Sequence, residues 1–191
     1  VEEQNGSCPN HQRPFERLSE ENYYLRCSDF TEQIREAIEK NKMRIVPEYR
    51  KKEILELLKD GAKDVSISRP RKSLSWGVPV PDDPDQVMYV WLDALSNYLT
   101  VLGYPDRPEW QDYWPADLQV VGKDILRFHA IIWPSILLGI GVALPKAILA
   151  HGFVNIGGVK ISKSLGNTID PNQVIDEYGL DAFRYFFARH I

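Results

Sequence analysis

The chain has 191 residues, of which 43% are hydrophobic and 26% charged, and its formal net charge is -4. These values are typical of a soluble globular protein and exclude a disordered chain, a collagen-like chain and a generic polyanion binder. Cys8 and Cys27 are the two cysteines, so a disulfide framework is not expected and a reducing compartment fits. The apolar run from Ala130 to Leu144 is too short and too interrupted to span a membrane. Because the chain begins with Val1 and has no signal-peptide pattern, we expect it to be a piece of a longer protein.

The first part of the chain is densely charged and predicts small elements joined by turns. Apolar residues recur at helical spacing in 30–39 and 51–58, so both segments predict helices. Asp29 is expected to cap the first helix, and Gly61 is expected to end the second. The alternating pattern of 65–68 predicts a half-buried strand.

From residue 82 onward, strands and helices are predicted to alternate. Short β-type runs occur at 87–90, 118–121 and 147–150. One helix is expected to begin at Trp91, and a second is expected to run from Asp124 to about Leu138 with a kink at Pro134. A third is expected to begin after the cap residue Asp170 and to end at Gly179, and a fourth to begin at Asp181. The last helix is expected to bury one side, formed by Leu180, Phe183, Phe186 and Phe187. This alternation predicts an α/β fold with a parallel sheet of the nucleotide-binding type.

A short cationic segment is the most informative feature of the sequence. Lys160 and Lys163 lie three residues apart, with Ser162 and Ser164 beside them and glycines on both sides. Ammonium groups act as compact point charges that suit a polyphosphate, and the glycines would let the loop close and reopen. From these residues alone, a solvated surface turn is an equally good interpretation.

The segment Lys160-Ile161-Ser162-Lys163-Ser164 resembles the K-M-S-K-S loop of class I aminoacyl-tRNA synthetases. Four further segments follow the order seen in methionyl-tRNA synthetases: 76–81, 89–94, 122–125 and 151–153. The resemblance covers essentially the whole chain. It implies part of a small α+β connective insertion over 1–81 and the second half of a class I Rossmann-type nucleotide-binding domain over 82–191. Synthetases for leucine, isoleucine and valine usually carry serine where Ala94 stands, and they remain an alternative.

The resemblance implies that the longer protein activates methionine with ATP and magnesium and transfers it to tRNA(Met), in the bacterial cytoplasm or the mitochondrial matrix. The second class signature, H-I-G-H, does not occur in 1–191, so the chain by itself is expected to be inactive. A non-catalytic RNA-binding module that uses Arg69 to Lys72 is a further alternative, although the net charge of -4 argues against it.

The resemblance also implies roles for individual residues. Lys160, Ser162, Lys163 and Ser164 would stabilise the pyrophosphate. ATP would be bound by Gly122, Asp124, His151, Gly152, Val154 and Lys163. Methionine would be bound by Trp91, Ala94, Tyr98, Ile125, His129 and Trp133. A polarizable thioether packs well against aromatic rings, and His129 is the polar group expected to recognise the sulfur. From the residues alone, ordinary core aromatics and a satisfied core histidine are the simpler interpretation.

Cys8 and His11 form a C-x-x-H pair, which is half of a zinc knuckle. Zinc requires four ligands, so the pair alone has no clear metal function. In the resembling family an upstream C-x-x-C completes such a site, which implies a structural zinc in the longer protein with Cys8 and His11 as a half-site.

Overall fold

The computed structural model describes residues 19–161 and 166–190, which form two compact units. One unit holds Ser66–Asp93 with the segment that ends at Tyr24, and the other holds Leu25–Val65 and Ala94–Ile191. Three elements contain the boundaries between these ranges: β1 (Tyr24–Leu25), β3 (Val65–Ser66) and α3 (Val90–Thr100). Each unit is described by itself below.

The smaller unit contains a three-stranded antiparallel sheet with the order β4-β6-β5. Its strands are β4 (Ser68–Pro70), β5 (Pro79–Val80) and β6 (Asp83–Met88). Val87 at the centre is fully buried, and a Cβ on Gly77 would lie 3.3 Å from its Cβ atom. The predicted strand at 87–90 therefore exists in part, but it ends at Met88 and pairs antiparallel with β4 and β5. It ends there because the next helix already begins at Val90.

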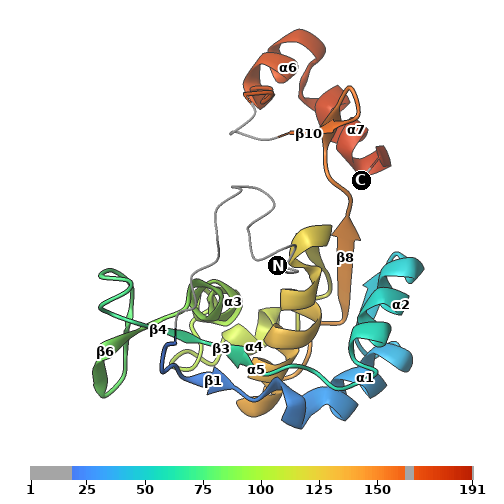
Figure 1. The fold of residues 1–191 in the computed structure, drawn as a ribbon. Helices are drawn as coiled ribbons and strands as arrows, with labels where there is room; N and C mark the ends of the chain where they lie inside the picture. Colours follow the sequence, from blue (N-terminus) through green and yellow to red (C-terminus); the bar gives the residue numbers. More distant parts are fainter. Residues whose placement is uncertain (1–18, 162–165, 191) are drawn as a thin grey trace, which may run out of the picture. The chain divides into compact units, whose positions relative to one another are not determined.

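The larger unit contains a parallel sheet with the order β2-β8-β7, whose central strand β8 is labelled in Figure 1. Its strands are β2 (Arg44–Val46), β7 (Gln119–Gly122) and β8 (Ala147–His151). The predicted strands at 118–121 and 147–150 correspond to β7 and β8. The third strand, β2, was not predicted, because its three residues are too few to give a period.

The larger unit also contains helices and short helical turns, besides its part of α3. They are η1 (Cys27–Phe30), α1 (Thr31–Glu39), α2 (Glu48–Leu57), α4 (Trp110–Tyr113), η2 (Lys123–Ile125), η3 (Phe128–Ile132), α5 (Trp133–Gly139), α6 (Pro171–Tyr178) and α7 (Leu180–His190). Helix α1 buries Ile34, Ala37 and Ile38 at helical spacing, and these side chains pack in one core with Ile45 of β2 and Ile148 of β8. The core therefore packs helix α1 against strands β2 and β8 of the sheet.

Two helix predictions were wrong in detail. Asp29 does not cap α1, because it lies inside η1 and its carboxylate pairs with Arg26 at 2.8 Å; Phe30 occupies the N-cap instead. The helical run at 124–138 is not one continuous α-helix. It is interrupted by the π-helical turn η3, and Pro134 lies in the first turn of α5, where a missing N–H is tolerated.

The two C-terminal helices were placed correctly, but their burial was not. Asp170 caps α6 by accepting from the backbone N of Asn172 at 2.9 Å, and Gly179 follows the helix with φ +85. No side chain of α6 or α7 is buried in the structure, and Leu180 and Phe186 are 50% and 53% exposed. The predicted buried side of the last helix is therefore wrong for residues 19–161 and 166–190, because no described residue covers these side chains well enough to bury them.

Candidate active site

A tight hairpin leads into the lysine segment. Strands β9 (Asn155–Ile156) and β10 (Val159–Lys160) pair antiparallel across Gly157 and Gly158, whose φ values are 56 and 81. Two consecutive positive φ angles define the two-residue turn that matches strand twist, and glycine adopts them most easily. The backbone of Lys160 thereby lies opposite Asn155. Ser162, Lys163 and Ser164 lie outside the described residues, so their predicted role stays a prediction.

The carboxyl ends of β7 and β8 lie side by side. Gly122 is the register partner of His151. A Cβ on Gly122 would lie 2.8 Å from Oδ1 of Asp124, so the Asp124 carboxylate folds back over the glycine. His151 Nδ1 donates to the carbonyl of Gly152 at 2.7 Å. Ligands of open parallel sheets bind outside this edge, which makes the pair of strand ends the natural nucleotide position.

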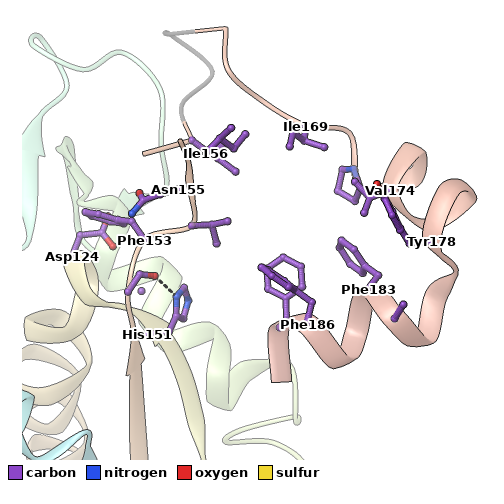
Figure 2. Close-up of a pocket in the computed structure, with 17 residues that line it drawn as sticks. Asp124, His151, Phe153, Asn155, Ile156, Ile169, Val174, Tyr178, Phe183 and Phe186 are labelled. Carbon is purple, nitrogen blue, oxygen red and sulfur yellow. Dashed lines mark hydrogen bonds between the residues drawn. The ribbon is translucent and has the colours of Figure 1, made fainter. Parts of the chain in front are cut away.

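A cavity of about 780 Å³ opens at this edge (Figure 2). Five residues predicted to bind ATP line it together: Gly122, Asp124, His151, Gly152 and Val154. The opposite lining comes from α6 and α7 and includes Val174, Tyr178, Phe183 and Phe186. Sequence analysis did not predict this apolar wall, because it assigned Phe183 and Phe186 to the buried side of the last helix and gave no role to Val174 or Tyr178.

Lys123 makes a contact that sequence analysis also missed. Its Nζ atom lies 4.5 Å from the ring centroid of Phe153, which is another residue of the cavity lining. A cation over an aromatic face is attractive, at about 0.5–1 kcal/mol where exposed. The contact links the turn after β7 to the segment after β8. Lys123 lies in the segment 122–125 and Phe153 in the segment 151–153, but the spacing of these segments in the sequence does not indicate that the two side chains are in contact.

Tyr98, Ile125 and His129 form a hydrogen-bonded group. Nδ1 of His129 lies 3.0 Å from the carbonyl oxygen of Ile125, and Nε2 lies 3.0 Å from the Tyr98 hydroxyl. A carbonyl only accepts, so Nδ1 carries the proton and Nε2 accepts from the tyrosine O–H. His129 is 3% exposed, and burial lowers its pKa while the Ile125 carbonyl raises it. Burial raises the pKa of Tyr98. The pair is therefore a neutral imidazole and a protonated phenol at neutral pH.

Trp133 completes this aromatic group. It is fully buried, and its ring lies 5.9 Å from that of Tyr98. Tyr98, Ile125, His129 and Trp133, four of the six residues predicted to bind methionine, are thus brought together. Ala94 lies one turn before Tyr98 on α3 and is exposed. Trp91 stands on the same helix within the smaller unit.

The buried histidine predicts how stability depends on pH. The unfolded chain takes up a proton near the ordinary histidine pKa of 6.5, whereas the folded chain takes it up only at lower pH. The unfolded state therefore binds more protons between these values, and the free energy of unfolding should fall as the pH drops below about 6.5. Urea unfolding of the wild type and of His129→Gln at pH of about 7.5 and about 5.5 measures this effect. The variant should lose less stability between the two pH values; equal losses would contradict the assignment.

Two absences apply to residues 19–161 and 166–190. Within these ranges, no group of three or more His, Cys, Asp or Glu side chains is placed to hold a metal ion. No helix there is both long and apolar enough to cross a membrane. Cys8 and His11 precede the first described residue, so the zinc half-site stays a prediction.

A parallel sheet with Gly122 and Asp124 at the end of one strand and His151 at the end of the next, all lining one cavity, is the arrangement of an α/β fold of the nucleotide-binding type. Comparison with known proteins makes the assignment specific. The family model described as tRNA synthetases class I (M) matches residues 4–191. The chain belongs to this family, and both the predicted family and the predicted α/β class are confirmed.

Individual relatives agree with this assignment. The chain is 45% identical over 188 residues to a methionine--tRNA ligase of Caldanaerobacter subterraneus subsp. tengcongensis, covering 97% of this chain and 29% of the relative. It is 47% identical over 180 residues to that of Brucella suis, covering 93% and 34%. The Mycobacterium tuberculosis methionyl-tRNA synthetase bound by methionyl-adenylate superposes with a TM-score of 0.84 at 43% identity, covering 97% of this chain and 36% of that one. The chain thus spans about a third of the length of these proteins.

Proposed function

We propose that this chain is the second half of the catalytic region of a methionine--tRNA ligase, which activates methionine with ATP and transfers it to tRNA(Met). The observation that carries the proposal is the cavity at the ends of β7 and β8, where five residues predicted to bind ATP converge. The names of the relatives and the methionyl-adenylate in a similar structure support the choice of amino acid.

The aromatic group suggests how a methionine side chain is recognised. A thioether sulfur is a weak hydrogen-bond acceptor, so it requires a donor. Both ring nitrogens of His129 already face protein oxygens. We therefore assign the donor role to the Tyr98 hydroxyl, whose single hydrogen would leave Nε2 of His129 when it turns toward a sulfur, so that one hydrogen bond is exchanged for the other. Trp133 supplies an aromatic face for the polarizable side chain.

ATP would lie along the edge of the sheet. Gly122 permits close approach, the Asp124 carboxylate can accept from ribose hydroxyls, and the segment from His151 to Val154 offers its backbone to adenine. The methionine carboxylate would displace pyrophosphate from the α-phosphate in line. Lys160 and Lys163, with Ser162 and Ser164, would stabilise the charge that develops on the leaving group. Magnesium bound to ATP would neutralise further phosphate charge.

One structural observation weakens the RNA-binding alternative. The guanidinium group of Arg69 stacks over Tyr89 at 4.4 Å and donates to Ser66 Oγ and the Ser68 carbonyl. Arg71 donates to the carbonyl of Pro84 at 2.8 Å. These arginines make intramolecular contacts that phosphate groups would have to displace.

Methionine-dependent exchange between ATP and pyrophosphate tests the proposal. We expect no exchange by this 191-residue chain, because the H-I-G-H half of the site is missing, and robust exchange by the protein translated from the complete reading frame. Leucine, isoleucine and valine serve as competing amino acids. Exchange that prefers one of them would contradict the methionine assignment, and exchange by the short chain alone would contradict the assignment as half of a site.

Two further expectations belong to the longer protein. A structural zinc would be held by Cys8, His11 and an upstream C-x-x-C, and the zinc content of the dialysed full-length protein tests this. The protein would act in the bacterial cytoplasm or the mitochondrial matrix.

A further inference from the structure

Trp114 is a buried tryptophan that neither the sequence motifs nor the cavity includes. It is 5% exposed and lies between α4 and β7. Its indole N–H donates to the carbonyl oxygen of Ala143 at 2.7 Å. Its ring meets the ring of Trp133 edge to face, with centroids 5.7 Å apart and an interplanar angle of 75°. A hydrogen bond and a ring contact therefore fix both the place and the orientation of this side chain.

Trp133 depends on its neighbours for its orientation. It is fully buried, yet its indole N–H has no hydrogen-bond partner among the described residues. A tryptophan usually uses this N–H to fix its ring. Here ring packing must do so, between Trp114 on one side and Tyr98 at 5.9 Å on another. Replacing Trp114 would therefore loosen the orientation of the Trp133 ring.

We propose that Trp114 is a positioning residue: anchored on the Ala143 carbonyl, it holds the Trp133 ring, and through it Tyr98, in the geometry that binds the methionine side chain. This inference rests on the proposed function. Trp114 itself does not touch the amino acid in this scheme. It supports the groups that do, as outer contacts commonly do in precise binding sites.

The location of Trp114 makes the inference specific for methionine. Trp114 precedes β7, and Ala143 precedes β8, so their hydrogen bond ties the segments at the amino ends of two parallel strands. The residues assigned to ATP stand at the carboxyl ends of the same strands. Loosening Trp114 should therefore disturb methionine binding and leave ATP binding nearly unchanged.

Trp114→Leu and Trp114→Phe in the full-length enzyme test the inference by ATP–pyrophosphate exchange. One aromatic contact contributes about 0.5–1.5 kcal/mol, which corresponds to about a 2- to 12-fold change in affinity. We expect Trp114→Leu to raise KM for methionine by a factor in that range, with KM for ATP and kcat within about twofold. Trp114→Phe should restore most of the affinity because it keeps a ring against Trp133, while water can reach the carbonyl of Ala143, a residue that is exposed as a whole.

Trp110→Leu is the matched control, because the Trp110 ring meets the ring of Tyr104 edge to face, with centroids 5.3 Å apart, and makes its ring contact there rather than with Trp133. If Trp114→Leu raised KM for methionine and ATP equally, or if both leucine variants changed KM for methionine alike, Trp114 would be merely structural. Should Trp114→Leu fail to fold, Trp114→Phe decides. The inference would be overturned if Trp114→Phe kept its thermal stability but raised KM for methionine as much as we expect from Trp114→Leu. Absence of methionine-dependent exchange in the unmutated enzyme would overturn the proposed function itself.

Discussion

Replacing Lys163 by alanine in the full-length enzyme is expected to lower the rate of methionyl-adenylate formation by about 10²–10³, while methionine binding changes little. The reason is that negative charge on the departing pyrophosphate appears mainly in the transition state, so an ammonium group placed there stabilises the transition state more than the bound substrates. Single-turnover formation of adenylate and equilibrium binding of methionine measure the two quantities separately.

Lys146→Ala is a suitable control. Lys146 also carries an exposed ammonium, and it pairs with Asp117 at 2.6 Å on the surface. An exposed ion pair contributes about 0–1 kcal/mol, so its loss should leave the rate within a few-fold of the unmutated enzyme. If Lys163→Ala formed adenylate as fast as Lys146→Ala, the lysine loop would not stabilise the pyrophosphate.

The second large effect is expected for Gly122→Ala. The new Cβ atom would lie 2.8 Å from Oδ1 of Asp124, which is closer than such atoms approach, so the carboxylate must move. A displacement of about 1 Å in a positioning group can cost about 10²-fold in rate. We therefore expect kcat/KM for ATP to fall by about 10- to 100-fold, with KM for methionine largely kept. Exchange kinetics with either substrate varied give both values.

Gly139→Ala provides the comparison for Gly122→Ala. A Cβ on Gly139, the last residue of α5, would make an ordinary contact of 3.6 Å with Phe30 and would meet no residue assigned to ATP. Its kinetics should match the unmutated enzyme. Gly122→Ala would speak against the ribose role of Asp124 if ATP use were unaffected, or if methionine use fell as much as ATP use.

The sequence predicted the strands of the sheet unevenly. β7 and β8 were predicted because 118–121 is a short β-type run ended by Gly122 and 147–150 is a continuous apolar run. β2 was not, since three residues leave no period to detect and its partner β8 is far away in the chain. Conversely, 87–88 read as part of the same layer, although its partners are antiparallel. Local pattern identifies strands, but it does not say which strands pair.

The candidate site divides in the same way. Motif residues such as Gly122 and Asp124 were found because their types and order are informative. The cation–π contact between Lys123 and Phe153 and the support of Trp133 by Trp114 were not, since they depend on side chains that meet only in three dimensions. The aromatic residues of α7 show the opposite failure. Their spacing indicates an apolar face, but the sequence alone does not say whether this chain covers it.

The position of β8 at the centre of the parallel sheet has a consequence for biosynthesis. β2 leaves the ribosome about a hundred residues before β8, the strand with which it pairs. At roughly 5–20 residues per second, this interval lasts on the order of 5–20 s. During that time the apolar β2 segment and the core side of α1 lack the strand that later lies beside them. Slow synthesis through 47–146 would lengthen this exposure, so chaperone dependence during translation should respond more to codon changes there than to changes after β8.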